Sequence, residues 1–140
     1  MTYIVRSMQI EAQIGDVWSY LTQPEKIAQW LMTNTFSAEV NHKFTMDCPP
    51  GIGSGAPIDC EVKEISPPNK NGRARLVYTW VIDKPFTETL LEIDLLEVSG
   101  STNLDLVHSG WAEGESELHT RHAQGWDHIL ETVLRGLLEK

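Results

Sequence analysis

The feature that most constrains this chain is a long amphipathic helix pattern at its end, preceded by strand patterns that need a cover. Apolar residues recur every three or four positions from Trp126 through Leu130 to Leu137, while Asp127 and Glu131 face away. Between about residues 38 and 110, apolar and polar residues alternate as in antiparallel strands with one solvated face. The sequence therefore predicts a long C-terminal helix packed on the other face of an antiparallel sheet.

The start of the chain predicts one strand and two short helices. Residues 3–10 have strand propensity. In the first helix, Ile14, Val17, Trp18 and Leu21 share one face, and Ile27, Trp30 and Leu31 do so in the second. The run Thr22-Gln23-Pro24-Glu25 between them matches a capping box, in which the Thr22 hydroxyl accepts from the amide of Glu25.

The middle of the chain predicts the rest of the sheet. We expect a loop over residues 48–57, because Gly and Pro are concentrated there, and a hairpin turn over 99–101. Strands are expected over residues 40–47, 58–65, 73–81, 87–98 and 102–110. Residues 1–140 then form a single α+β domain, with a curved antiparallel sheet of about six strands. A curved sheet that grips one helix leaves a gap between them, which is the natural place for a ligand.

Composition excludes several classes of function. The formal charge is 11 − 20 = −9, which argues against binding to nucleic acid or to anionic membranes. The apolar content of 41% is too high for a disordered chain, and no apolar run is long enough to span a membrane. The N-terminus lacks a signal-peptide core, and Cys48 and Cys60 do not form a disulfide framework. We therefore expect a reduced cytoplasmic protein without a cofactor.

Five segments in order resemble the helix-grip, START-like (SRPBCC) superfamily, in the branch named after the activator of the heat-shock protein 90 ATPase (AHSA-type). They are the Val17-Trp18 helix with its Thr-x-Pro-Glu cap and Trp30, residues 62–68, residues 76–80, residues 102–110, and Gly125-Trp126 followed by Leu130. Asn41, His42 and Cys60 depart from the pattern at positions where glycine is common. The resemblance implies the helix-grip fold, with the long helix across the concave face, but this fold hosts many functions.

Aromatic and histidine residues are the candidates for chemistry. Trp30, Trp80 and Trp126 belong to elements that should converge, so they either pack the core or line a cavity for flat, apolar ligands. His108 shares a face with Leu104 and Leu106, and is either a structural histidine bonded to a backbone carbonyl or Ser109, or a polar handle for a ligand. The predicted ligand-binding residues are Trp30, Phe44, Met46, Trp80, Leu91, Leu106, His108 and Trp126. His119, His122 and His128 match no metal motif, and we predict no metal site.

Three functions remain open. The first is a binding module for a lipid, flavonoid or polyketide-like molecule, acting for example in a stress response. The second, implied by the resemblance, is a protein-interaction module that binds a chaperone through the acidic residues Glu113, Glu115 and Glu117. The third is a cyclase- or hydrolase-type enzyme that uses His108 as acid or base, which ranks below the other two because no convincing nucleophile is adjacent. Homodimerisation through an edge strand or exposed tryptophans is also plausible.

Overall fold

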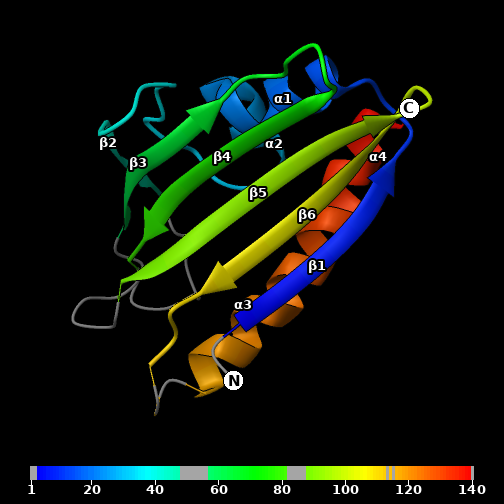
Figure 1. Ribbon diagram of the computed structural model, residues 1–140. Coiled ribbons are helices and arrows are strands. Elements are labelled where there is room, and N and C mark those ends of the chain that lie inside the picture. Colours follow the sequence, from blue (N-terminus) through cyan, green and yellow to red (C-terminus); the bar gives the residue numbers. More distant parts are fainter. Residues whose placement is uncertain (1–2, 48–56, 82–87, 113, 115, 140) are drawn as a thin grey trace.

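A six-stranded antiparallel sheet forms the frame of the protein in a computed structural model, which describes residues 3–47, 57–81, 88–112, 114 and 116–139. The strand order is β1-β6-β5-β4-β3-β2, so the first strand lies at one edge and the second at the other (Figure 1). The strands are β1 (Tyr3–Ile10), β2 (Lys43–Met46), β3 (Ile58–Ser66), β4 (Arg73–Trp80), β5 (Thr89–Val98) and β6 (Ser101–Ser109).

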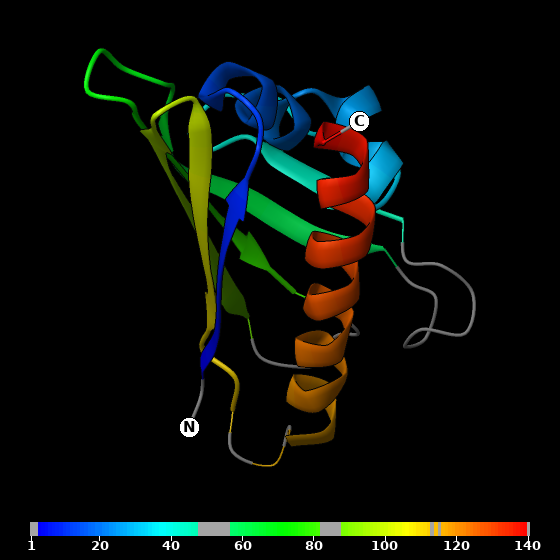
Figure 2. The ribbon, with the colours of Figure 1, turned by 90° about the vertical axis from the view of Figure 1, so that its right-hand side faces the viewer.

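The helices all lie on one face of the twisted sheet (Figure 2). Two short helices, α1 (Ile14–Thr22) and α2 (Pro24–Trp30), follow β1 directly. The C-terminal helix consists of α3 (Ser116–His128), a π-helical segment η1 (Ile129–Leu134) and α4 (Arg135–Leu138). No helix among the described residues is long and apolar enough to cross a membrane.

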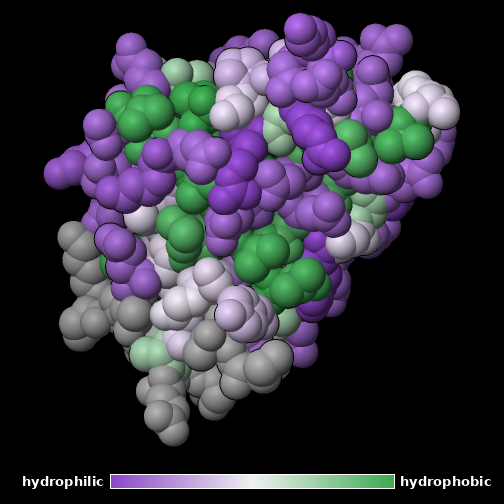
Figure 3. Space-filling view, in the orientation of Figure 1, coloured by the Kyte–Doolittle hydropathy of each residue, from purple (hydrophilic) through white to green (hydrophobic). Residues whose placement is uncertain are grey.

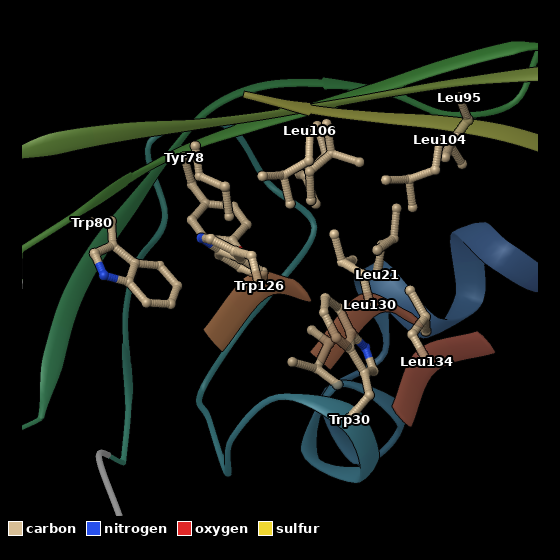
Figure 4. Close-up of a cluster of buried hydrophobic side chains, with 14 of the residues drawn as sticks. Leu21, Trp30, Tyr78, Trp80, Leu95, Leu104, Leu106, Trp126, Leu130 and Leu134 are labelled. Carbon is tan, nitrogen blue, oxygen red and sulfur yellow. The ribbon is translucent and has the colours of Figure 1, made fainter. Parts of the chain in front are cut away.

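Alternation along the strands sorts side chains between the two faces. On β5, Thr89, Leu91, Ile93 and Leu95 point toward the helices and are buried, whereas the residues between them are half-buried on the outer face. The inward residues of the sheet meet Trp126, Leu130 and Leu134 from the C-terminal helix, together with Leu21 and Trp30 from the short helices (Figure 4). The apolar stripe of the C-terminal helix is thus removed from water, as its periodicity predicts.

The C-terminal helix also covers the open edge of β1. The Arg135 guanidinium donates to the Gln9 carbonyl at 2.8 Å, and Nε2 of His119 donates to the Tyr3 carbonyl at 3.0 Å. Arg6 of β1 forms an ion pair with Asp127 of α3 at 2.5 Å. Edge carbonyls that would otherwise invite a further strand are therefore occupied by side chains of the same chain.

Most predicted elements are present, with three local corrections. Thr22 does not form a capping box: it ends α1 and its hydroxyl donates to the Trp18 carbonyl, while Gln23 is the N-cap of α2. The strand expected over 40–47 begins only at Lys43, because Val40 and Asn41 form a turn in which Asn41 has a φ of 73°. The C-terminal helix is not a continuous α-helix, since η1 widens its middle turns. The expected loop falls mostly at 48–56, outside the described residues.

Candidate functional site

Aromatic and imidazole rings gather between the sheet and the second half of α3. Trp80 comes from the end of β4, His108 from the end of β6, Trp111 from just after β6, and His122 and Trp126 from α3. The ring centroids of Trp80 and Trp126 lie 5.8 Å apart, those of His108 and Trp111 4.7 Å, and those of Trp111 and His122 4.6 Å. We call these five residues the aromatic cluster.

A chain of hydrogen bonds crosses the cluster and starts at the helix. The indole N–H of Trp126 donates to Nδ1 of His108 at 3.1 Å, so Nδ1 carries no hydrogen. The hydrogen of His108 is then on Nε2, which donates to the Thr89 hydroxyl at 2.7 Å. The Thr89 hydroxyl in turn donates to the Trp80 carbonyl at 2.7 Å. The donor and the acceptor are thus defined for every hydrogen bond along this path.

The path returns to the same helix from Trp80. Its indole N–H donates to Nε2 of His122 at 3.2 Å. His122 and Trp126 are four residues apart and therefore lie on one face of α3. The helix is thus bonded to the sheet at two points one turn apart, through β6 at one and β4 at the other. These bonds tie α3, β6, β5 and β4 together.

Burial determines the charge of His108. The side chain is 0% exposed, and desolvation lowers its pKa well below the ordinary value, with His122 and His119 lowering it further. The ring is therefore neutral at neutral pH, in agreement with its hydrogen-bond roles. Both ring nitrogens are occupied, by Trp126 and Thr89, rather than by a backbone carbonyl or Ser109 as one of our two interpretations had it.

The predicted ligand-binding residues divide into three groups. Trp80, His108 and Trp126 belong to the aromatic cluster, and Leu91 and Leu106 are buried on the neighbouring inward positions of β5 and β6. Phe44 of β2 packs against Phe36 and Tyr78, and its ring centroid lies 5.1 Å from each of theirs. Met46 is also buried on β2.

Trp30 lies away from the aromatic cluster. Figure 4 shows it beside Leu130 and Leu134, with Trp126 between it and Trp80. Its indole N–H donates to the Tyr20 carbonyl at 2.6 Å. Trp30 therefore packs the end of the concave face that α1 and α2 cover.

Three members of the site were missing from the prediction: Thr89, Trp111 and His122. Thr89 has a signal in the sequence, since it is a polar residue on the inward parity of Leu91 and Ile93. His122 also has one, because it precedes Trp126 by four residues on the same helix face. Trp111 follows β6 in a loop, where periodicity gives no direction.

The cysteines and the acidic residues around the start of α3 are the remaining candidates from the sequence. Cys48, Glu113 and Glu115 lie outside the described residues, and so does the side chain of Glu117. Cys60 is a buried free thiol on β3, and burial together with the nearby Asp59 raises its pKa, so the thiol stays protonated. Among the described residues, no group of three or more His, Cys, Asp or Glu side chains is arranged to hold a metal ion.

The curved sheet that grips a long C-terminal helix, with aromatic residues between them, defines a helix-grip protein of the START-like class. The model of the family described as Activator of Hsp90 ATPase homolog 1-like protein matches residues 11–139, and the chain belongs to that family. The resemblance and the fold class expected from the sequence are thereby confirmed.

Solved structures agree with this assignment. Protein MLL2253 from Mesorhizobium loti is 27% identical, with a TM-score of 0.85 over 98% of this chain and 96% of its own. Protein BH1534 from Bacillus halodurans is also 27% identical, with a TM-score of 0.77 over 99% of each chain. The Aha1 dimer from Colwellia psychrerythraea, at 17% identity and a TM-score of 0.75 over 99% and 97%, shares the fold. Among curated proteins, none matches the chain.

Proposed function

We propose that this protein binds a small apolar or aromatic molecule between the sheet and the C-terminal helix. The observation that carries the proposal is the aromatic cluster. In it, three indoles surround one neutral imidazole in the buried layer between the sheet and α3. Indole faces favour flat, apolar partners, and burial contributes about 25 cal/mol per Å² of apolar surface removed from water. A lipid, a flavonoid and a polyketide-like compound are the ligand classes that we expect.

Binding at this place requires α3 to move, because its rings already contact those of the sheet. In α3, Trp126 is the buried apolar anchor, and the bonds to His108 and Trp80 hold the helix down. The adjoining η1 segment places a π-helical stretch behind this half of the helix, and such stretches occur often at functional sites. A ligand that stacks on Trp80 would take the place of Trp126. Nδ1 of His108 would then accept a hydrogen bond from the ligand instead of from the Trp126 indole.

The experiment is a titration with a flavonoid, a fatty acid and the fluorescent probe 1-anilinonaphthalene-8-sulfonate. We expect at least one of them to raise the melting temperature and to change tryptophan fluorescence. Trp126→Phe should alter the affinity, whereas the matched variant Trp18→Phe on α1 should leave it unchanged, since Trp18 is absent from the aromatic cluster. The proposal is rejected if no compound of a broad hydrophobic library shifts the melting temperature or changes tryptophan fluorescence.

A second candidate follows from the family, whose description names an activator of the Hsp90 ATPase. In that case the protein would bind a chaperone and change its ATPase rate, with its net charge of −9 steering it toward a basic surface. Co-precipitation with Hsp90 followed by an ATPase assay separates this candidate from the first. An unchanged ATPase rate at saturating protein would exclude it.

An enzymatic role for His108 is less well supported by the geometry. A general base needs a free lone pair within reach of a substrate. Nδ1 of His108 accepts from Trp126, and Nε2 carries the hydrogen that is donated to Thr89. The replacement of His108 by Gln would still distinguish the two roles, since an enzyme loses turnover while a carrier keeps most of its binding.

A further inference from the structure

A hollow lies on the outer face of the sheet, away from the helices. Figure 3 shows hydrophilic and hydrophobic side chains side by side over β3 on this face. The hollow has a volume of about 430 Å³ and lies where β2, β3 and β4 run side by side. Its side walls include Thr35, Lys43, Glu61, Thr79 and Glu88. A volume of this size is within the range of small-molecule sites, which starts at about 300 Å³.

Strand register fixes the order of the polar groups across the floor. Lys43 of β2 is opposite Glu61 of β3, and Thr45 is opposite Asp59. The Glu61 amide donates to the Thr79 hydroxyl of β4 at 2.9 Å, which brings Thr79 beside Glu61. Directly opposed residues have their Cβ atoms about 5 Å apart, so these groups form one continuous surface.

Thr79 is the observation that points to a ligand. It is 5% exposed, although it faces away from the helices, and its hydroxyl oxygen accepts from the Glu61 amide. The hydroxyl donates no hydrogen bond to any of the described residues. A buried hydroxyl with an unused donor favours an acceptor brought by something else. Thr35 also lines the hollow, and its hydroxyl accepts from the Thr45 amide at 3.0 Å, but Thr35 is exposed and its hydroxyl hydrogen can reach water.

The charges at the rim are of both signs. Lys43 and Glu88 are exposed, line the hollow, and have no ion-pair partner in the part of the chain that the structure describes. Asp59 and Glu61 also line the hollow, but neither is free of partners, and Glu61 is paired with Lys63 at 3.3 Å. One ammonium group with two threonine hydroxyls offers donors to an anionic group, while the Glu88 carboxylate offers an acceptor to a cationic one.

We propose that this outer hollow binds a small zwitterion of the amino acid or short-peptide class. Its carboxylate would lie toward Lys43 and the hydroxyl of Thr79, and its ammonium toward Glu88. The alternation of β2, β3 and β4 turns the side chains of Lys43, Glu61 and Thr79 away from the helices, so these groups are separate from the aromatic cluster. It is therefore independent of the function proposed above.

The test is a titration of the ¹⁵N-labelled full chain with glycylglycine, followed by amide chemical shifts. We expect shifts at Thr45, Glu61 and Thr79 at millimolar concentrations, without shifts at Trp126. Glycylglycine amide and N-acetylglycylglycine, which each keep only one charge, should bind more weakly. Lys43→Gln and Glu88→Gln should each weaken binding about two- to fivefold, as for exposed ion pairs.

Lys70→Gln is the matched control, since Lys70 is an exposed lysine in the β3–β4 turn with no partner among the described residues. It should bind glycylglycine as the unaltered protein does. The proposal is overturned if no amide shifts at saturation of the titration, if the shifts fall on the concave face, or if the singly charged analogues bind equally well. Binding of an aromatic probe to the concave face decides nothing here, so the two proposals fail separately.

Discussion

The indole N–H of Trp126 donates to Nδ1 of His108 at 3.1 Å, across the boundary between the C-terminal helix and the sheet. This one bond sets the tautomer of a fully buried histidine and thereby the direction of the hydrogen bonds to Thr89 and Trp80. The aromatic cluster is consequently a polar network with no unpaired buried side-chain atom among the described residues. Such networks stabilise a structure when every member is satisfied and destabilise it when one partner is removed.

The first prediction concerns Thr89, whose hydroxyl accepts a hydrogen bond from the single ring N–H group of His108. Thr89→Val keeps the shape of the side chain but leaves Nε2–H of His108 without its acceptor. The free energy of unfolding should fall by about 1–3 kcal/mol, the usual cost of a buried unsatisfied donor. Urea unfolding measures this change. Thr132→Val, at an exposed position of η1, should change the value by less than about 0.5 kcal/mol. Equal effects of the two variants would contradict the hydrogen-bond path.

The second prediction concerns pH. The pKa of His108 is well below its ordinary value in the folded protein, because burial disfavours the charged ring and His122 and His119 oppose a further positive charge. Below a pH of about 6.5 the unfolded chain binds a proton at this position that the folded chain does not. The free energy of unfolding should therefore fall as pH decreases below about 6.5, by at most about 1.4 kcal/mol per pH unit from this group.

The control for the pH experiment uses two histidine variants. His108→Gln removes the group, so its stability should depend less steeply on pH below 6.5, whatever its stability at neutral pH. His128→Gln changes an exposed histidine of α3 and should keep the slope of the unaltered protein. An unchanged slope in His108→Gln would show that other groups cause the pH dependence.

The third prediction concerns Arg75 on the outer face of the sheet. Its guanidinium lies 2.7 Å from Glu92, 2.7 Å from Asp94 and 3.2 Å from Glu64, and these contacts raise its pKa. Arg75→Met leaves three carboxylates together and should reduce the free energy of unfolding by about 1 kcal/mol at low salt, since the group is partly exposed.

Salt provides the diagnostic for Arg75. Because ~1 M salt screens exposed charges beyond about 3 Å, the loss caused by Arg75→Met should shrink as salt is added. Arg73→Met alters an exposed arginine with no ion pair among the described residues, and should show neither the loss nor the salt dependence. A salt-independent loss would mean that Arg75 acts through packing of its alkyl chain.

The fourth prediction separates two glycines by their backbone. Gly100 has a φ of 86° in the hairpin turn between β5 and β6, whereas Gly136 lies in α4, where a Cβ would meet nothing within 4 Å. Gly100→Ala should lower the melting temperature, at a cost of about 1 kcal/mol for the left-handed conformation. Gly136→Ala should raise the melting temperature, because the higher helix propensity of alanine adds up to about 1 kcal/mol to the free energy of unfolding. A change of the same sign in both would refute the conformational argument.

The aromatic cluster shows where prediction from the sequence stops. Local patterns placed Trp80, His108 and Trp126 on elements that converge, and the inward parity of His108 follows from Leu104 and Leu106. The partners of His108 could not be predicted in this way, because Thr89 is 19 residues and Trp126 18 residues away. Register between strands and the height of a helix above a sheet depend on packing of the whole core, which no local window contains.

The periodicities can be read from the amino-acid sequence alone: the strands, the amphipathic helices, the Ser99-Gly100 turn and the order that places a helix over a sheet. These follow from short-range geometry, since 2.0 and 3.6 residues per repeat are properties of the backbone. Three features depend on the packed fold: Trp30 lies away from Trp80, His108 is neutral with both nitrogens bonded, and Lys43, Glu61 and Thr79 share a hollow. Contacts between distant residues and the loss of water around them arise only when all the elements are packed together.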